Sequence, residues 1–244
     1  MIGLAGGDDV GDSVLWVALT VGLFVVPVAI GSAVIARLQQ TFYRRLEFIR
    51  SYRWPPALLD QLKKHHPDFT RKETALIAQG LKQFFIAHLR SGRAYVAMPS
   101  QAADELWHEF ILYTRAYQEF CDQAFGRFLH HTPAVALAPA RQRTNEGLRR
   151  VWWWSCKEES INPTNPTRLP LLFALDKKLN IPNGYHYTAD CEQLRKNGVP
   201  GTQCGGDFSS SSFDGSTTGM GDGGTGVNDG ADGGGSDGGG CGGD

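Results

Sequence analysis

The sequence has no surplus of charge of either sign and lacks the short motifs that identify common enzymes. Its 24 Lys and Arg residues are balanced by 25 Asp and Glu residues, for a net charge of −1. Nucleic-acid binding would call for a basic excess. A Walker loop, a G-x-S-x-G nucleophile turn, an H-E-x-x-H motif and a dinucleotide-binding glycine fingerprint are all missing. We therefore expect no nucleic acid, predict no cofactor and identify no catalytic residues.

One stretch near the start lacks charge altogether. Residues 13–36 contain no Asp, Glu, Lys or Arg, and they are numerous enough to cross a hydrocarbon layer of ~30 Å. The preceding residues 1–12 are short, glycine-rich and acidic. A secretory signal peptide is the alternative, but such a peptide has a basic start and a shorter apolar core. We predict a transmembrane helix over 13–36, with the lipid bilayer as its partner.

Arginines crowd the far side of this apolar stretch, where residues 37–53 contain one acidic residue, Glu47. The positive-inside rule places such a flank in the cytoplasm, which predicts a single-pass protein with its N-terminus outside and its main domain cytoplasmic. Apolar spacing predicts that 37–53 continues as a basic juxtamembrane helix. Its arginines either contact anionic headgroups or act only as a stop-transfer flank. The candidate membrane-surface residues are Arg37, Arg44, Arg45, Arg50 and Arg53.

Cysteine is scarce, and its spacing matches no disulfide framework. No C-x-x-C pair occurs, and a domain in a reducing compartment keeps its cysteines as thiols. We therefore expect free thiols at all five positions. The cysteines are Cys121, Cys156, Cys191, Cys204 and Cys241.

Residues 54–190 show helical apolar spacing without convincing strand alternation, which predicts a compact all-α, multi-helix domain. Pro56 suits the first position of a short helix. Thr70 and Glu73 have the spacing of a capping box and open the clearest amphipathic helix in the chain. His88 lies on the apolar face of that helix, so we expect a neutral, hydrogen-bonded core residue. Further helices are predicted after Ser100, from about 145 to 159 and from about 169 to 179.

The composition changes beyond residue 190. The 40 residues from Gly205 include 17 glycines and 7 aspartates, and no Lys or Arg follows Lys196. Such a segment cannot bury enough apolar surface to offset the entropy of ordering it. We predict a disordered Gly/Asp/Ser-rich tail over residues 191–244.

Aromatic and histidine residues concentrate between positions 98 and 133. In the helix predicted after Ser100, Trp107 faces the core and His108 lies at the edge of the apolar stripe. Asp104 is one turn before His108, so its carboxylate could orient the imidazole. An Asp/His pair at this spacing also occurs in helices without any function. His108 is therefore either a functional group or an ordinary hydrogen-bonded side chain.

The same region contains Cys121, His130 and His131, but their spacing does not support a shared metal ion. A straight helix would hold His108 and Cys121 ~20 Å apart. The interval from Cys121 to the two histidines fits no familiar zinc spacing, so the metal is left unknown. The candidate ligand-binding residues are Asp104, Trp107, His108, Tyr117, Cys121, His130 and His131.

These residues also carry a family resemblance. The run Asp104-x-x-Trp107-His108, then Tyr117, Cys121, Gly126-Arg127 and His130-His131-Thr132-Pro133, resembles the signature of the glycine-rich domain-containing (GRDP-like) family. The resemblance covers roughly residues 54–190 and is closest to the short bacterial membrane-associated type. It implies a helical domain with a glycine-rich tail and no established reaction. Longer members have a second His shortly after the Trp-His pair, which this sequence lacks.

Three functions fit these features. The first is a membrane-anchored helical interaction or scaffold module with a protein partner. The second is a small-ligand or metal-binding module centred on Asp104, Trp107 and His108. The third is an enzyme with His108 as acid/base, although no second catalytic group can be named. The sequence favours the first and does not predict an enzyme.

Overall fold

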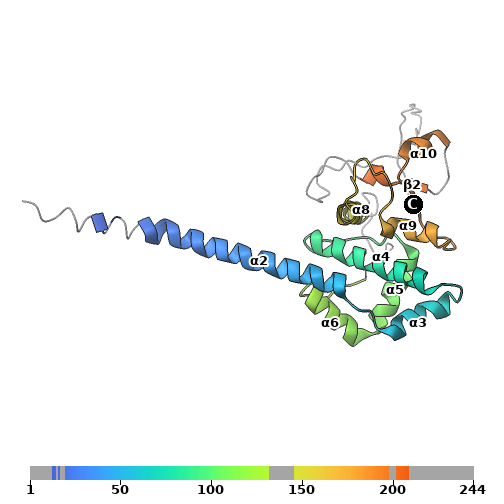
Figure 1. The fold of residues 1–244 in the computed structure, drawn as a ribbon, viewed down its shortest axis with the longest axis horizontal. Coiled ribbons are helices and arrows are strands. Elements are labelled where there is room, and N and C mark those ends of the chain that lie inside the picture. The colour runs from blue at the N-terminus through green and yellow to red at the C-terminus, as the bar shows by residue number, and fades with distance from the viewer. Residues whose placement is uncertain (1–12, 15, 17–19, 132–145, 198–201, 209–244) are drawn as a thin grey trace, which may run out of the picture.

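A computed structural model shows a helical domain from which one long helix projects (Figure 1). It describes residues 13, 14, 16, 20–131, 146–197 and 202–208. The predicted acidic N-terminus and residues 209–244 of the predicted tail lie outside this part. In chain order, the elements are η1 Val21–Val25, α2 Val26–Ser51, α3 Pro56–His65, α4 Arg71–Arg90, α5 Gln101–Leu112, α6 Thr114–Ala124, α8 Glu146–Glu158, α9 Leu171–Lys178, β1 His186–Thr188, α10 Cys191–Asn197, β2 Thr202–Cys204 and η3 Gly205–Phe208.

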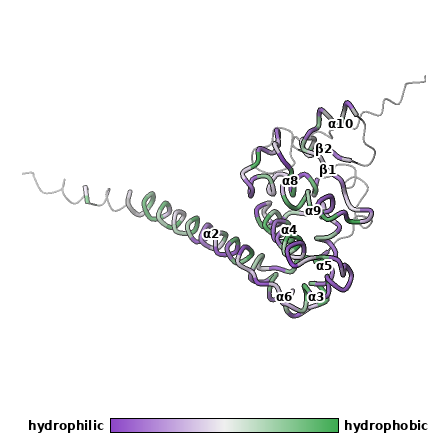
Figure 2. The backbone as a smooth tube through the Cα atoms, turned by 45° about the vertical axis from the view of Figure 1, so that its right-hand side comes forward, coloured by the Kyte–Doolittle hydropathy of each residue, from purple (hydrophilic) through white to green (hydrophobic). Residues whose placement is uncertain are grey.

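The projecting helix confirms the predicted apolar segment. The helical run Gly22–Ser51 has a mean hydropathy of 1.7 over its most apolar window, and none of that window is buried. By length and composition it can cross a membrane, although a signal sequence near an N-terminus has the same features. Figure 2 shows hydrophobic colour along its outer part and more hydrophilic colour nearer the domain. The fold is therefore all-α with one N-terminal apolar helix, as predicted.

The last two turns of α2 belong to the domain. Leu46 and Ile49 are buried in the core. The ring of Phe48 lies 5.7 Å from that of Phe120 on α6, and the ring of Tyr52 lies 4.7 Å from it. The apolar helix is therefore joined to the domain through packed side chains rather than through a free linker.

Helix α4 is the centre of the domain and lies between α8 and α9 on one side and α3, α5 and α6 on the other (Figure 1). Its start confirms the predicted capping box, because Thr70 Oγ1 accepts a hydrogen bond from the Glu73 amide and Glu73 Oε2 accepts one from the Thr70 amide at 2.7 Å. The predicted α3 is also present, with Pro56 at its first position.

The helix predicted after Ser100 starts as expected but is shorter. Ser100 Oγ accepts a hydrogen bond from the Ala103 amide at 3.2 Å, which caps α5. The chain then breaks at Tyr113, and α6 continues in a new direction. Gly126 adopts φ 72°, a conformation that glycine adopts without strain, and ends this pair of helices.

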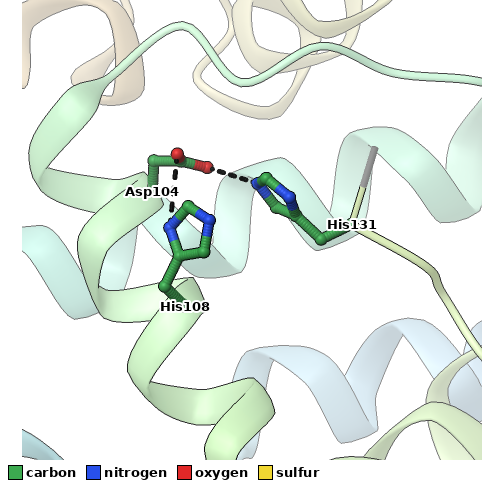
Figure 3. Close-up of side chains that lie close together, drawn as sticks. All are labelled: Asp104, His108 and His131. Carbon is green, nitrogen blue, oxygen red and sulfur yellow. Dashed lines mark hydrogen bonds and ion pairs between the residues drawn. The ribbon is translucent and has the colours of Figure 1, made fainter. Parts of the chain in front are cut away.

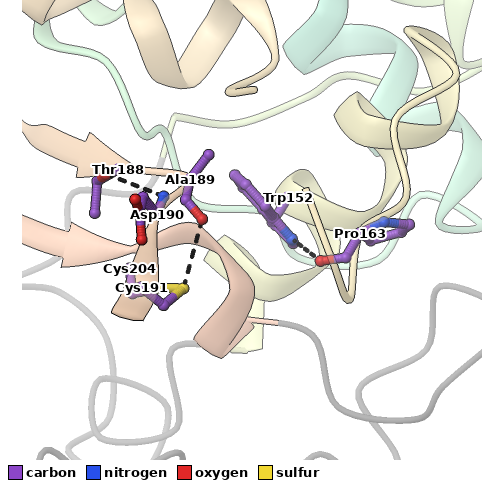
Figure 4. The surroundings of a disulfide bond; sticks show 7 residues. All are labelled: Trp152, Pro163, Thr188, Ala189, Asp190, Cys191 and Cys204. Carbon is purple, nitrogen blue, oxygen red and sulfur yellow. Dashed lines mark hydrogen bonds between the residues drawn. A yellow bond between two sulfur atoms is a disulfide. The ribbon is translucent and has the colours of Figure 1, made fainter. Parts of the chain in front are cut away.

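Helix α8 carries the three consecutive tryptophans. Trp152 and Trp153 are buried, and Trp154 is partly buried with the Arg90 guanidinium 5.7 Å from its ring centre. Trp152 Nε1 donates a hydrogen bond to the Pro163 carbonyl at 3.0 Å (Figure 4). Three adjacent indoles are accommodated because the helix packs on α4, α9 and η3.

The chain after residue 190 is more ordered than the sequence predicts. Strand β2 pairs in parallel with β1, and the Phe208 ring packs 5.9 Å from the Trp152 ring. Cys191 and Cys204 form a disulfide with their Cα atoms 5.2 Å apart (Figure 4). The expectation of free thiols is therefore wrong for Cys191 and Cys204, and residues 202–208 form a short strand and turn that pack on the helices. Short elements tied by a disulfide and one aromatic ring give little periodic signal in a glycine-rich stretch.

A single buried carboxylate orders the start of α5. Asp176 on α9 is 1% exposed. Its Oδ1 accepts a hydrogen bond from the Ser100 hydroxyl at 2.7 Å, and its Oδ2 accepts one from the Gln101 amide at 2.8 Å. The amides of Ala102 and Tyr185 donate to the same carboxylate at 3.3 and 2.9 Å. A negative charge at this end of α5 also complements the helix dipole.

We expect Asp176→Ala to lower the free energy of unfolding by about 3 kcal/mol, because four donors, two of them in buried contacts, lose a buried acceptor. Thermal unfolding of the full chain in detergent, followed by circular dichroism, measures the change. The exposed Asp60 of α3 provides the matched control, and Asp60→Ala should change stability by less than about 0.5 kcal/mol. Equal effects of the two substitutions would contradict this role for Asp176.

Candidate functional site

Three of the predicted site residues meet at one place on the domain surface. Asp104 and His108 lie on successive turns of α5, and His131 arrives from the segment that follows α6 (Figure 3). Asp104 Oδ1 lies 3.0 Å from His131 Nε2, and Asp104 Oδ2 lies 3.4 Å from His108 Nδ1. The two imidazole rings are 4.2 Å apart between centres. One carboxylate thus contacts two histidines from different segments.

This cluster is partly open to solvent. The side chain of His131 is 17% exposed, that of Asp104 30% and that of His108 53%. Because a carboxylate only accepts hydrogen bonds, His131 carries its proton on Nε2 when it binds Asp104. A metal ion that took the place of this proton would reach the three side chains from the solvent side.

Trp107 and Tyr117 hold the segment that carries His131. Trp107 Nε1 donates a hydrogen bond to the Tyr117 hydroxyl at 3.1 Å, and that hydroxyl donates to the Leu129 carbonyl at 2.5 Å. The indole of Trp107 also lies edge-on to the His131 imidazole, with ring centres 4.6 Å apart. Both residues therefore position the cluster from the core side.

The geometry of the cluster is suitable for a metal ion. One donor atom from each of Asp104, His108 and His131 can be chosen so that all three lie within 4.8 Å of one another. In a tetrahedral zinc site with bonds of ~2.0–2.1 Å, neighbouring donors are ~3.3 Å apart. Each histidine nitrogen lies near that spacing from one of the two Asp104 oxygens, His131 Nε2 at 3.0 Å from Oδ1 and His108 Nδ1 at 3.4 Å from Oδ2. Three protein donors would leave a fourth position open to water or ligand.

The remaining predicted residues lie outside this cluster. Cys121 is buried on α6, and burial raises the pKa of its thiol, which disfavours the thiolate that binds metals. His130 is exposed, and its ring contacts that of Phe128 with centres 4.8 Å apart. The sequence argued against a metal ion shared by Cys121 and the histidines, left the metal unknown, and kept a metal-binding module centred on Asp104, Trp107 and His108 as an alternative. In the structure, the carboxylate of Asp104 is the group that joins His108 and His131.

The predicted membrane-surface arginines have different environments. Arg37, Arg44 and Arg53 are exposed. Arg50 forms an ion pair with Glu158 at 2.6 Å, which links α2 to α8. Arg45 is partly buried, and burial and the nearby Arg93 guanidinium lower the pKa of its own guanidinium. At least two of the five therefore have contacts within the domain as well as proximity to the apolar helix.

A second set of histidine contacts lies between α3 and α5. His66 Nε2 lies 2.6 Å from Glu105 Oε2, and the His66 ring stacks on Phe69 with centres 4.4 Å apart. His65 Nε2 lies 3.5 Å from Glu109 Oε1. These pairs connect the two helices.

A cavity of about 440 Å³ adjoins the cluster. It lies between the segment that joins α4 to α5 and the segment that follows α6, and Trp107 and His131 form part of its wall. His88 also lines it and is 4% exposed. Its Nδ1 lies 3.0 Å from the Ala94 carbonyl, so Nδ1 carries the proton. Its Nε2 is buried and has no partner among the described residues.

Burial lowers the pKa of His88 to about 4. The hydrogen bond to Ala94 opposes this decrease, and the positive charges of Arg127 and Arg93 add to it. His88 is therefore neutral at pH 7. The prediction of a neutral histidine on the apolar face is supported, but the expectation that its polar atoms are satisfied is wrong for Nε2.

The fold and the cluster define a helical domain with one apolar N-terminal helix and an Asp/His/His surface site. A family model described as UCP032817-like matches residues 44–208, about two thirds of the chain. The chain therefore belongs to the UCP032817-like family. No curated protein and no solved structure matches the chain.

This match corrects the family predicted from the sequence. The resemblance to the GRDP-like family depended on aromatic, histidine and glycine positions between 104 and 133, whereas the family match spans the whole domain and names a different family. Core aromatics and helix-ending glycines recur in unrelated helical domains because the same packing rules apply. The matched range also ends at residue 208, where the described structure ends.

We expect His88 to make the domain less stable in mild acid. Its pKa is about 4 in the folded chain and 6.5 in the unfolded chain, so its contribution is complete above pH 6.5. The contribution is lost as pH falls toward 4, at about 1.4 kcal/mol per pH unit and about 3 kcal/mol in total. Unfolding of His88→Phe should lack this part of the slope. Replacing the exposed His186 of β1 by Gln provides the control, which should keep the wild-type slope.

Proposed function

We propose that this protein is a membrane-anchored domain that binds one divalent transition-metal ion, of the Zn²⁺ class, through Asp104, His108 and His131. The observation that carries the proposal is the convergence of these side chains from α5 and from the segment after α6. Asp104 and His108 are fixed relative to each other because they lie one turn apart on α5. The third is held in place by Trp107 and Tyr117.

The donor set favours zinc over the alkaline-earth ions. Two imidazole nitrogens and one carboxylate oxygen suit Zn²⁺ and its neighbours, whereas Ca²⁺ and Mg²⁺ prefer all-oxygen sites. An open fourth position would let the ion take a water molecule or an external ligand. The site is shallow, with His108 about half exposed, so the ion would exchange with solvent.

The interaction-module hypothesis has less support from the surface. Outside α2 and the residues before it, the exposed large apolar side chains in the described part of the chain are Leu112 and Tyr185. They lie on different elements, and a protein-binding patch usually combines several such residues. An enzyme with His108 as acid/base would use the same Asp104 contact, but no observation names its substrate.

We expect the purified full chain to bind one zinc ion and to lose at least about 100-fold in affinity in Asp104→Ala, His108→Ala and His131→Ala. Each substitution removes one of three donors. Isothermal titration of chelator-treated protein in detergent measures the affinity, and elemental analysis measures the stoichiometry. Zinc at 100 times its dissociation constant should also stabilise the wild type by about 2.7 kcal/mol.

His186→Ala is the matched control, because this histidine is exposed on β1 and outside the cluster. It should keep the wild-type affinity. The metal proposal would be abandoned if the wild type neither retained nor bound zinc, or if His186→Ala weakened zinc binding as much as His108→Ala. The cluster would then be a carboxylate that orients two histidines by hydrogen bonds.

We further propose that the domain lies on the cytoplasmic side, with α2 as the anchor. The exposed Arg37 and Arg44 on the domain side of the apolar segment support this orientation. The Cys191–Cys204 disulfide is the observation that opposes it, because lasting disulfides are typical of oxidising compartments. In a cytoplasmic domain this bond would form and break with the redox state.

Reporter fusions after residue 208 test the orientation. We expect a green fluorescent protein fusion to fluoresce and an alkaline phosphatase fusion to be inactive, because the phosphatase folds only after export. The reverse pattern would place the domain outside and make the disulfide a permanent structural bond.

A further inference from the structure

The Cys191–Cys204 disulfide ties together elements that have few other attachments (Figure 4). Cys191 is the first residue of α10, and Cys204 is the last residue of β2. The strands β1 and β2 have three residues each, and α10 packs mainly on β2 and η3. A ladder of two such short strands is only marginally stable in water. The positions of β2 and α10 therefore depend on the disulfide.

Residues 202–208, here called the strap, cover aromatic rings of the helical core. The Phe208 ring is 5.9 Å from the Trp152 ring and 6.0 Å from the Tyr187 ring between centres. Gly205 lies directly against the Trp152 indole, where a larger residue would clash. Trp152 is completely buried and Phe208 is 6% exposed. Release of the strap would therefore bring the Trp152 ring into contact with solvent.

One of the two cysteines can be approached from outside. A hollow of about 650 Å³ is lined by Cys191, by Gly206 and by the loop 164–167. Cys191 is partly exposed, whereas Cys204 is buried and does not line the hollow. Thiol–disulfide exchange begins when a thiolate reaches one of the two sulfurs. Cys191 is the side of the bond that an external thiol can approach.

We propose that this disulfide is a redox switch, and that its reduction by a dithiol releases the strap. One thiolate of the dithiol attacks the Cys191 sulfur and forms a mixed disulfide, while the Cys204 sulfur leaves and takes up a proton. The second thiol of the dithiol then displaces the Cys191 sulfur, which also takes up a proton. Two electrons and two protons pass to the protein, and the dithiol becomes a cyclic disulfide.

The change is confined to the strap and α10. Helix α4 packs on α5, α8 and α9 without any contribution from the disulfide, so the helical core keeps its own contacts when the bond opens. Cys121 and Cys156 are buried thiols in the structure, and neither takes part in the exchange. Reduction therefore produces local opening of one segment rather than unfolding of the domain.

Hydrogen exchange measured by mass spectrometry locates the change. We expect the amides of residues 202–208 to exchange about ten-fold or more faster after the full chain in detergent is treated with dithiothreitol, and those of α4 to keep their rate. Millimolar reduced glutathione should open the bond as well. The proposal would be overturned by unchanged exchange of the strap in the reduced chain, by an equal loss of protection in α4, or by a bond that glutathione leaves intact.

The double variant Cys191→Ser, Cys204→Ser should show the fast strap exchange without any reductant. Cys241→Ser is the matched control, because it removes a cysteine outside the pair, and it should respond to dithiothreitol as the wild type does. Slow strap exchange in the double variant, or no response in the control, would contradict the switch.

Phe208→Ala keeps both cysteines and tests the proposal even if the double variant does not fold. Packing of the strap and closure of the bond stabilise each other, so loss of the ring should make the bond about ten-fold easier to reduce at equilibrium with dithiothreitol. An unchanged equilibrium would overturn the link between the bond and the strap.

The use of this switch in the cell rests on the cytoplasmic orientation proposed above, because an oxidising compartment keeps disulfides closed. The two ideas fail separately. Reporter fusions that place the domain outside would remove the orientation, whereas exchange of the purified chain does not depend on it. A strap that stays protected after reduction would remove the switch in either orientation.

Discussion

The candidate site depends on a carboxylate that is not part of it. Asp176 on α9 binds the first backbone amides of α5 and the hydroxyl of Ser100, and so fixes where α5 begins and how it is directed. The rotation of α5 in turn places Trp107 in the core and Asp104 and His108 at the surface. A buried charge is favourable here because four donors surround it and the helix dipole adds to them.

The same packing connects the apolar helix to the site. Residues near the end of α2 are buried against α4 and α6, and α6 leads directly into the segment that carries His131. The guanidinium of Arg45 also lies against Gly126, at the turn that begins this segment. The Asp104, His108 and His131 cluster therefore lies on a body that is packed against the apolar helix, and not at the end of a flexible tether.

Local sequence signals predicted individual elements well. The capping box at Thr70, the helix start after Ser100 and Pro56 at a first helical position each depend on residues within one turn of one another, and the structure confirms them. The site was harder to predict. Asp104 and His108 are visible as a spacing of four residues, but His131 joins them only after the chain reverses beyond α6. The sequence was interpreted as one straight helix through Tyr113, so the approach of His131 to Asp104 was not predicted.

By itself, the sequence determined the all-α class, the single apolar N-terminal helix and the residue types available for chemistry, because periodicity and composition act locally along the chain. Only the tertiary structure decided which of these residues meet. It paired Cys191 with Cys204, packed Phe208 against Trp152, buried Nε2 of His88 without a partner among the described residues and placed one carboxylate between two histidines. The reason is physical: these contacts join segments far apart in the chain, and their distances are set by the packing of the helices between them.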